Sequence, residues 1–286
     1  TILGPKENIR TFKRKDFAAY LARNYVPANT VVAIAGSFSK EKVLAKIKKE
    51  FGHLAAKLAP VAAPFAFAQT TPRVAIKEKK TDQTQLMLGV PAYPYLHKDE
   101  YALAVLATIL GGGMSSRLFM EVREKRGLAY SVHAWAEKYP DTGYFVVQAG
   151  VEHGKLPKTI QTILAEFRKM KKENVSSAEL SKAKAYIKGT STIALETSDA
   201  VAENAATSLI NVGKIRPLEE ILKGIDAVTA ADVHRVAKDI FTTSTLNLAV
   251  IGPHLHAEPL LKLLRVYSRT PSASRIARFR VGPPRL

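Results

Sequence analysis

The stretch of residues 111–132 constrains the fold of this chain more than any other segment. Three glycines end an apolar helix there, a short helix with a basic end follows, and Gly127 turns the chain into a strand. This path predicts that Arg123 and Tyr130 lie side by side. A guanidinium and a phenol both donate hydrogen bonds, so the pair is suited to hold a polarised carbonyl oxygen.

The sequence on both sides of this stretch predicts an α+β domain. Apolar residues recur at strand spacing in some segments and at helical spacing in others. Strands come first, helices follow and one strand returns, which is typical of a mostly antiparallel sheet with helices on one face. The predicted strands cover residues 73–78, 83–90, 128–138, 143–151 and 245–251, and the predicted helices cover 98–110, 155–173, 176–195, 198–212, 217–224 and 230–240.

The first 54 residues are too few to form a domain of this kind. Helices are predicted at residues 14–25 and 40–51, and the continuous apolar run at 30–36 predicts a buried strand. A lone strand cannot satisfy its backbone groups, so this one needs neighbours that the chain does not supply before residue 73. Residues 55–72, rich in Ala and Pro, predict an extended linker.

The net charge of +18 is high enough to suggest a nucleic-acid-binding protein. However, residues 265–286 hold six of the arginines and no acid, and the lysines elsewhere are spread over predicted helices as on solvated faces. No recognised nucleic-acid motif accompanies the charge, so no specific nucleic-acid partner is expected. No apolar run reaches the roughly 18 residues of a membrane span, and the lack of cysteine excludes disulfides and thiolate metal sites.

The motif at 111–132 resembles the C-terminal half of the pitrilysin and mitochondrial-processing-peptidase family. Members of that family are zinc proteases with an inverted H-x-x-E-H motif. Their second half carries an Arg and a Tyr seven residues apart, which fall here on Arg123 and Tyr130. The N-terminal residues resemble the end of the family's first half, through Leu3-Gly4, Glu7-Asn8, Tyr25, Pro27, Asn29 and the run 31–36.

This resemblance implies a chain made of one homologous half and the remnant of another. Residues 1–54 would be the incomplete end of the first domain and 55–72 the linker. Residues 73–253 would form the second domain, which carries the Arg/Tyr pair, and 254–286 a flexible C-terminal extension. About 150 residues of the first half would then be missing, judged by the usual size of such a domain.

The zinc motif itself is absent from the sequence. Its nearest approach runs from His97 to Tyr101, where Glu100 has the required spacing but a tyrosine stands at the place of the second His. We therefore interpret His97 as a helix-start residue. The resemblance implies zinc in the complete enzyme and none in this chain.

Three other candidate sites are interpreted as structural. His254 and His256, with Glu258 close by, are expected in an exposed loop next to prolines, and His133 is expected to be a half-buried packing residue of a strand. The glycines at 111–113 end a helix and lack the Lys-Ser/Thr of a phosphate loop.

The resemblance therefore implies the C-terminal half of a zinc metalloendopeptidase. Arg123 and Tyr130 would contact the carbonyl of a peptide substrate, and the chain would be inactive without the zinc-binding half. A non-catalytic family member that acts as a scaffold or partner subunit is the alternative, and a basic nucleic-acid-binding protein is a weaker one. Expected partners are the peptide, the missing half or a partner subunit, and further copies of this chain in a homo-oligomer, with no membrane.

Overall fold

The computed structural model describes residues 4–54, 56–58 and 60–267 of the chain. Two compact units are present. One comprises Thr1–Pro64 with Leu195–Ile210 and the other Phe65–Ala194 with Asn211–Leu286. We call the described part of the second unit the body, and residues 4–54 the N-terminal segment.

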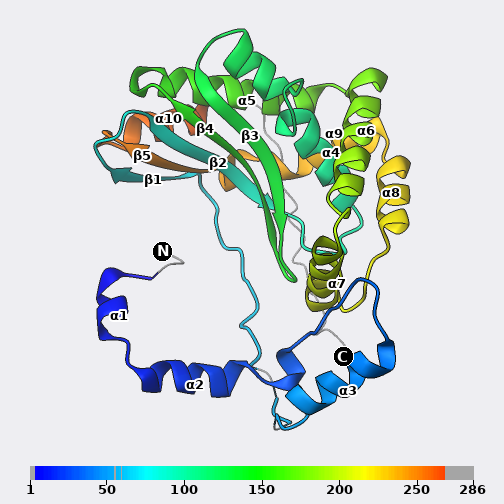
Figure 1. Ribbon diagram of the computed structural model, residues 1–286. Coiled ribbons are helices and arrows are strands. Elements are labelled where there is room, and N and C mark those ends of the chain that lie inside the picture. The colour runs from blue at the N-terminus through cyan, green and yellow to red at the C-terminus, as the bar shows by residue number, and fades with distance from the viewer. Residues whose placement is uncertain (1–3, 55, 59, 268–286) are drawn as a thin grey trace. The chain divides into compact units, whose positions relative to one another are not determined.

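The body is built on a five-stranded sheet with strand order β1-β5-β2-β4-β3 (Figure 1). The outer strand β1 pairs in parallel with β5, and every other neighbouring pair is antiparallel. The predicted α+β class with a mostly antiparallel sheet is therefore confirmed. The strands are β1 (Arg73–Glu78), β2 (Thr84–Ala92), β3 (Ala129–Lys138), β4 (Gly143–Val151) and β5 (Asn247–Gly252).

One face of this sheet carries the hydrophobic core. Alternate residues point to opposite faces of a strand, and in β2 the buried set is Thr84, Leu86, Leu88 and Val90. Helices of the body pack on this side (Figure 1), with Phe145 of β4 against Phe167 and Phe241. The helices of the body are α4 (Glu100–Gly111), α5 (Leu156–Lys172), α6 (Ser177–Ile193), α8 (Leu218–Ala227), α9 (Ala230–Ile240) and α10 (Glu258–Val266).

The N-terminal segment forms its predicted helices but not its predicted strand. Its helices are α1 (Lys6–Thr11), α2 (Arg14–Asn24) and α3 (Lys40–Phe51), and α7 (Ser198–Val212) lies mostly in the same unit. Residues 30–36 form no strand, so that prediction is wrong for this chain. No described strand of the N-terminal segment is available to pair with them, and Val32 and Ile34 remain 44% and 47% exposed.

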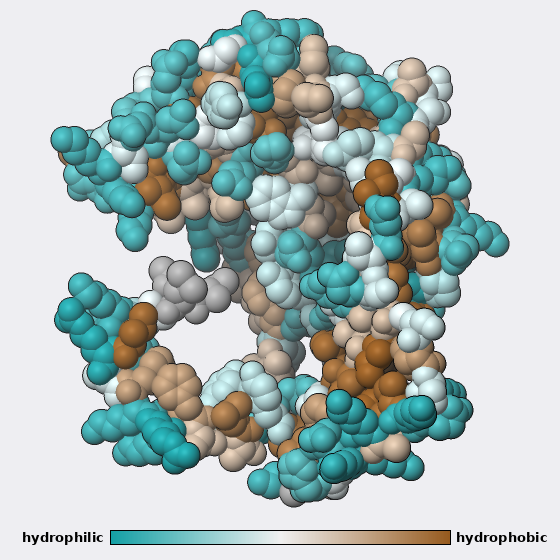
Figure 2. All heavy atoms as spheres, in the orientation of Figure 1, coloured by the Kyte–Doolittle hydropathy of each residue, from teal (hydrophilic) through white to brown (hydrophobic). Residues whose placement is uncertain are grey.

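Apolar side chains of α2 are also uncovered in this segment. Phe17, Tyr20, Leu21 and Tyr25 are all exposed, and tan and brown atoms lie among teal ones over α1 and α2 in Figure 2. Val26 is the one buried residue among residues 4–54. The helices of this segment therefore form from local signals, without a core of their own.

The C-terminal extension differs from its prediction. Residues 258–266 were expected to be flexible, but they form helix α10, whose Leu260 and Leu264 join the core of the body. Their spacing of four residues puts both on one face of the helix, which is the reason it docks. The Arg-rich remainder, 268–286, lies outside the described residues. None of the described helices is long and apolar enough to cross a membrane.

Candidate functional site

The motif at 111–132 is held against the core at both of its ends. Helix α4 ends where Gly111 touches β3, and a Cβ at this glycine would collide with Ala134. The following segment, η2 (Phe119–Glu124), is a π-helix in which Lys125 N–H donates to the carbonyl of Met120, five residues back, at 2.9 Å. The sequence predicts only a short helix here. Single-turn π-helices occur frequently at functional sites.

A glycine turn leads from this helix into β3. Gly127 has a φ of +55°, which other residues adopt at a cost, and its N–H donates to the carbonyl of Arg123 at 2.9 Å. Leu128 N–H donates to the carbonyl of Val122 at 2.8 Å. These two bonds return the chain beside the helix and bring Arg123 close to the first residues of the strand.

A β-bulge at the start of β3 determines where Tyr130 points. Ala129 pairs with Val151 but Ser131 already pairs with Gly150, so Tyr130 is the extra residue. Tyr130 is 76% exposed although its neighbours Ala129 and Val132 are buried. The Tyr130 ring therefore does not pack beside Val132, because the bulge breaks the alternation that would have buried it.

The structure brings Arg123 and Tyr130 together, as the sequence predicts. The guanidinium carbon of Arg123 lies 5.3 Å from the centre of the Tyr130 ring and 4.8 Å from that of Phe119. Glu124 is its acidic neighbour, with Oε1 at 3.6 Å from Nε of Arg123. A cation over an aromatic face is attracted by the ring quadrupole, so Arg123 orients the ring of Tyr130. The phenol is left open to solvent as a donor.

The other acid of the π-helix is occupied by cations. Glu121 accepts from Lys125 Nζ at 2.7 Å and also from Arg126 Nη1. The hydrogen bonds from Lys125 and then Arg126 lower the pKa of Glu121 from 4.5 to about 2. The Glu121 carboxylate is thus held ionised and paired with two cations near neutral pH.

His97 has the structural role that the sequence predicts. Its Nδ1 accepts from the N–H of Asp99 at 3.1 Å, directly before α4, and its ring stacks on Tyr93 at 3.9 Å. Burial lowers its pKa. His133, in contrast, is exposed on β3 and not half-buried, so its expected packing role is wrong.

The expectation of exposed loop histidines is wrong for His254. Its Nε2 lies 2.7 Å from Oγ1 of buried Thr84, whose hydroxyl also lies 2.9 Å from Nδ1 of His153. Burial, followed by the nearby His153, lowers the pKa of His254. His153 was not singled out from sequence, because its partners are 69 and 101 positions away and no local pattern marks them. His256 and Glu258 are not part of this cluster in any described contact.

The described residues do not supply a zinc site. Among residues 4–54, 56–58 and 60–267, no group of three His, Cys, Asp or Glu side chains could hold a metal ion. A catalytic zinc needs three protein ligands and one open position. The described residues therefore do not fit this metal.

A model of the peptidase M16 inactive domain matches residues 11–187, which include the whole Arg/Tyr motif. The chain belongs to the peptidase M16 family. It contains the inactive C-terminal domain of that family, and the resemblance predicted from the motif is confirmed.

Named relatives of this M16 chain are zinc proteases. It is 31% identical over 270 residues to an uncharacterized zinc protease of Mycobacterium leprae, covering 93% of this chain and 60% of that protein. It is also 31% identical over 252 residues to the uncharacterized zinc protease YmxG of Bacillus subtilis, covering 88% and 61%. The chain thus spans about three fifths of the length of these relatives.

Solved structures share the fold. A protease from Helicobacter pylori superposes with a TM-score of 0.76 at 27% identity, covering 87% of this chain and 61% of that one. The peptidase M16 inactive domain from Pseudomonas fluorescens gives 0.78 at 23% identity, with coverages of 88% and 60%. A chain of complex III from Candida albicans gives 0.80 at 22% identity, with coverages of 92% and 65%. The last two likenesses concern the fold alone.

Proposed function

We propose that this chain is the C-terminal half of a zinc metalloendopeptidase and that it holds the scissile carbonyl of a peptide substrate with Arg123 and Tyr130. The observation that carries the proposal is the bulge, which turns Tyr130 to solvent beside a guanidinium 5.3 Å from its ring. A tyrosine used only for packing would be buried, as Tyr93 is.

The role of the pair follows from the charge that develops in acyl transfer. When a nucleophile attacks a peptide carbonyl carbon, negative charge builds on the oxygen, and a donor already in place stabilises it without reorganisation. The Tyr130 phenol is such a donor. Arg123 positions the ring and can donate to a backbone carbonyl of the substrate. The metal ligands, on this proposal, belong to the half that this chain lacks, and the chain alone is inactive and holds no stoichiometric zinc.

The test is cleavage after the missing half has been supplied, in cis or as a separate chain. Tyr130→Phe should lower kcat about 10²–10³-fold, as removal of one oxyanion donor does elsewhere. Tyr186→Phe is the matched control, because Tyr186 is a half-exposed tyrosine of α6 outside the pair, and it should leave the rate unchanged. An unchanged kcat in the Tyr130→Phe enzyme would remove the phenol from the mechanism. Elemental analysis of the chain alone showing one zinc per chain would contradict the placement of the ligands.

A non-catalytic scaffold or partner subunit is the second candidate function. The likeness of fold to a chain of complex III from Candida albicans supports it. The exposure of Tyr130 favours the protease half, because a scaffold does not need a phenol turned to solvent beside a guanidinium. A reconstituted pair of halves that binds peptide but never cleaves it would favour the scaffold.

We also propose that the chain by itself forms a homo-oligomer through residues 30–36. The support is that this apolar run has no strand beside it in the described N-terminal segment, and an apolar extended segment can pair its backbone with the same segment of another copy. Light scattering at micromolar concentration should show more than one copy per particle, with slow amide exchange in 30–36. A monomer with rapid exchange throughout this run would contradict it.

A further inference from the structure

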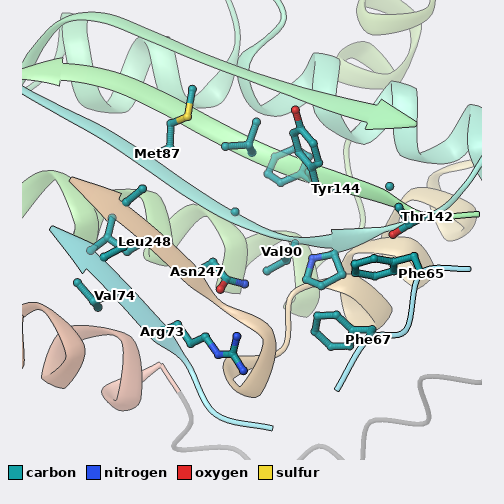
Figure 3. Close-up of a pocket in the computed structure, with 17 residues that line it drawn as sticks. Phe65, Phe67, Arg73, Val74, Met87, Val90, Thr142, Tyr144, Asn247 and Leu248 are labelled. Carbon is teal, nitrogen blue, oxygen red and sulfur yellow. The ribbon is translucent and has the colours of Figure 1, made fainter. Parts of the chain in front are cut away.

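The face of the sheet opposite the core contains a trough of about 630 Å³ (Figure 3). Its floor consists of side chains from β1, β5, β2 and β4 that point away from the helices. One wall comes from the segment before β1, from which Phe65 and Phe67 project over the end of the sheet. The volume lies within the range of specific ligand sites, roughly 300–1,000 Å³. The lining includes Ala75, Met87, Pro91, Tyr144, Val146 and Ala249.

Most residues that line the trough are apolar; Thr142 and Asn247 are polar, and Arg73 is the charged residue of the lining. Arg73 is exposed at the start of β1, and within the described part of the chain no acidic side chain forms an ion pair with its guanidinium. A cation beside an apolar surface selects a ligand that combines an apolar part with a carboxylate. The net charge of +18 favours an acidic ligand over a basic one as well.

The wall of the trough also offers unpaired backbone. Phe65 N–H donates to Oδ2 of Asp141 at 2.7 Å, and the Gln69 side chain donates to the carbonyls of Ser244 and Leu246. These contacts anchor the segment at its two ends. Between them, the backbone groups of residues 66–68 make no hydrogen bond to another described residue. An extended peptide can add to such a segment through its main chain, which a lipid or a small acid cannot do.

We propose that this trough is a subsite for an extended peptide segment in which apolar side chains are followed by an acidic one. The apolar side chains lie on the floor against Met87 and Tyr144, the peptide backbone runs along residues 66–68, and the carboxylate pairs with Arg73. The inference rests on the proposed peptide-binding function and specifies which peptides are preferred.

The position of the trough predicts a spacing along the peptide. Tyr144 pairs with Glu137 across β4 and β3, and Glu137 is seven positions after Tyr130 on the same strand. At about 3.3 Å per residue, the Tyr144 end of the trough lies roughly 23 Å from Tyr130 along the strand. A peptide that occupies both places has its apolar side chains about seven residues from the cleaved bond.

The test measures binding of fluorescently labelled ten-residue peptides to the full chain, without the missing half. One peptide carries Leu-Phe-Leu followed by Glu in a Gly/Ser background, and its twin carries Lys in place of Glu. The acidic peptide should bind about tenfold more tightly, and Arg73→Gln should remove the difference. Lys77→Gln is the matched control, because Lys77 lies exposed four positions along the same strand and outside the lining, and it should preserve the difference.

A second pair of variants fills the trough without disturbing the core. Ala75→Trp and Ala249→Trp introduce large side chains at exposed positions of the floor, and each should weaken binding of the acidic peptide at least about tenfold. Ile193→Trp, at an exposed position of α6 outside the lining of the trough, should leave the affinity for the acidic peptide unchanged. Circular dichroism and melting temperature confirm that each variant is folded.

The outcomes separate this inference from the proposed function. Equal affinity of wild type, Arg73→Gln and Ala75→Trp for a peptide that does bind would overturn the trough and leave the proposed function standing. If Arg73 distinguishes the two peptides but the reconstituted enzyme cleaves nothing, the trough stands as a peptide subsite and the proposed protease function is wrong. If the filling variants change the oligomeric state but not the peptide affinity, the trough is a surface for a second copy and the inference is wrong.

Discussion

The body and the N-terminal segment carry the same kinds of local signal and reach different results. Both have capped helices and both have a continuous apolar run that predicts a strand. In the body, the run at β5 lies between β1 and β2 and buries Leu248 and Val250. In the N-terminal segment, the run at 30–36 has no described strand beside it and forms none. A helix satisfies its own backbone, whereas a strand requires a partner.

The largest expected difference concerns aromatic side chains. Phe167 is fully buried, stacked on Phe241 at 4.1 Å and edge-on to Phe145 at 5.7 Å. Phe167→Ala should lower the free energy of unfolding of the body by about 3–5 kcal/mol, because it leaves a cavity in the core. Phe17→Ala on exposed α2 should change it by less than about 0.5 kcal/mol. Denaturant melts followed by the fluorescence of Trp135 in β3 measure both values.

The same two substitutions also test whether the N-terminal segment and the body unfold together. If Phe17→Ala destabilises the body as much as Phe167→Ala does, the N-terminal segment is part of one cooperative core and its exposed side chains are covered in solution. Covering by another copy of the chain would make the loss depend on protein concentration.

A smaller difference is expected for the two helix caps. Ser176 accepts from Glu179 N–H at 3.2 Å, and Glu179 in turn pairs with Arg117 of the body at 2.8 Å. Ser176→Ala should therefore cost about 1 kcal/mol of the stability of the body. Ser39 caps α3 in the same way, through Lys42 N–H. Ser39→Ala should reduce the far-ultraviolet helix signal slightly and leave the main unfolding transition in place. If it shifts that transition as much as Ser176→Ala does, α3 unfolds together with the body.

Much of the fold could be predicted because its signals are local or repetitive. The helices follow their caps and apolar spacing, as at Ser176, and the hairpin of β3 and β4 follows its turn sequence. The failures have one common cause. The pairing of residues 30–36 and the docking of α10 both depend on surfaces that are distant in sequence. The apolar pattern of a strand or a helix does not predict whether such a surface exists.

In the candidate site, too, the features set by local sequence could be predicted and those set by distant contacts could not. The closeness of Arg123 and Tyr130 could be predicted, because the motif contains the whole path between them. The direction of the Tyr130 side chain could not, since it depends on a bulge created by the pairing of β3 with β4. The trough and the cluster around Thr84 were missed because their members come from separate strands and loops, although Phe65 and Phe67 stand out as aromatics in an Ala- and Pro-rich segment.

The smallest expected effect compares two carboxylates at acidic pH. Hydrogen bonds from Lys125 and Arg126 lower the pKa of Glu121 in the body from 4.5 to about 2. A lowered pKa in the folded state means that the stabilisation is present above pH 4.5 and is lost as the pH falls from 4.5 towards 2. Glu121→Gln should therefore flatten the decline of stability in this window.

Glu41 of α3 is the matched comparison in the N-terminal segment. Its own backbone N–H and then the Ser39 hydroxyl lower its pKa, but the side chain is exposed and both groups lie in the N-terminal segment. Glu41→Gln should leave the pH dependence of the main unfolding transition unchanged. Melts of both variants at intervals between pH 2 and pH 5 provide the measurement. If stability falls with pH equally steeply in Glu121→Gln and in wild type, Lys125 and Arg126 do not bind the Glu121 carboxylate in solution. The π-helix beside Arg123 then lacks the constraint that these two hydrogen bonds provide.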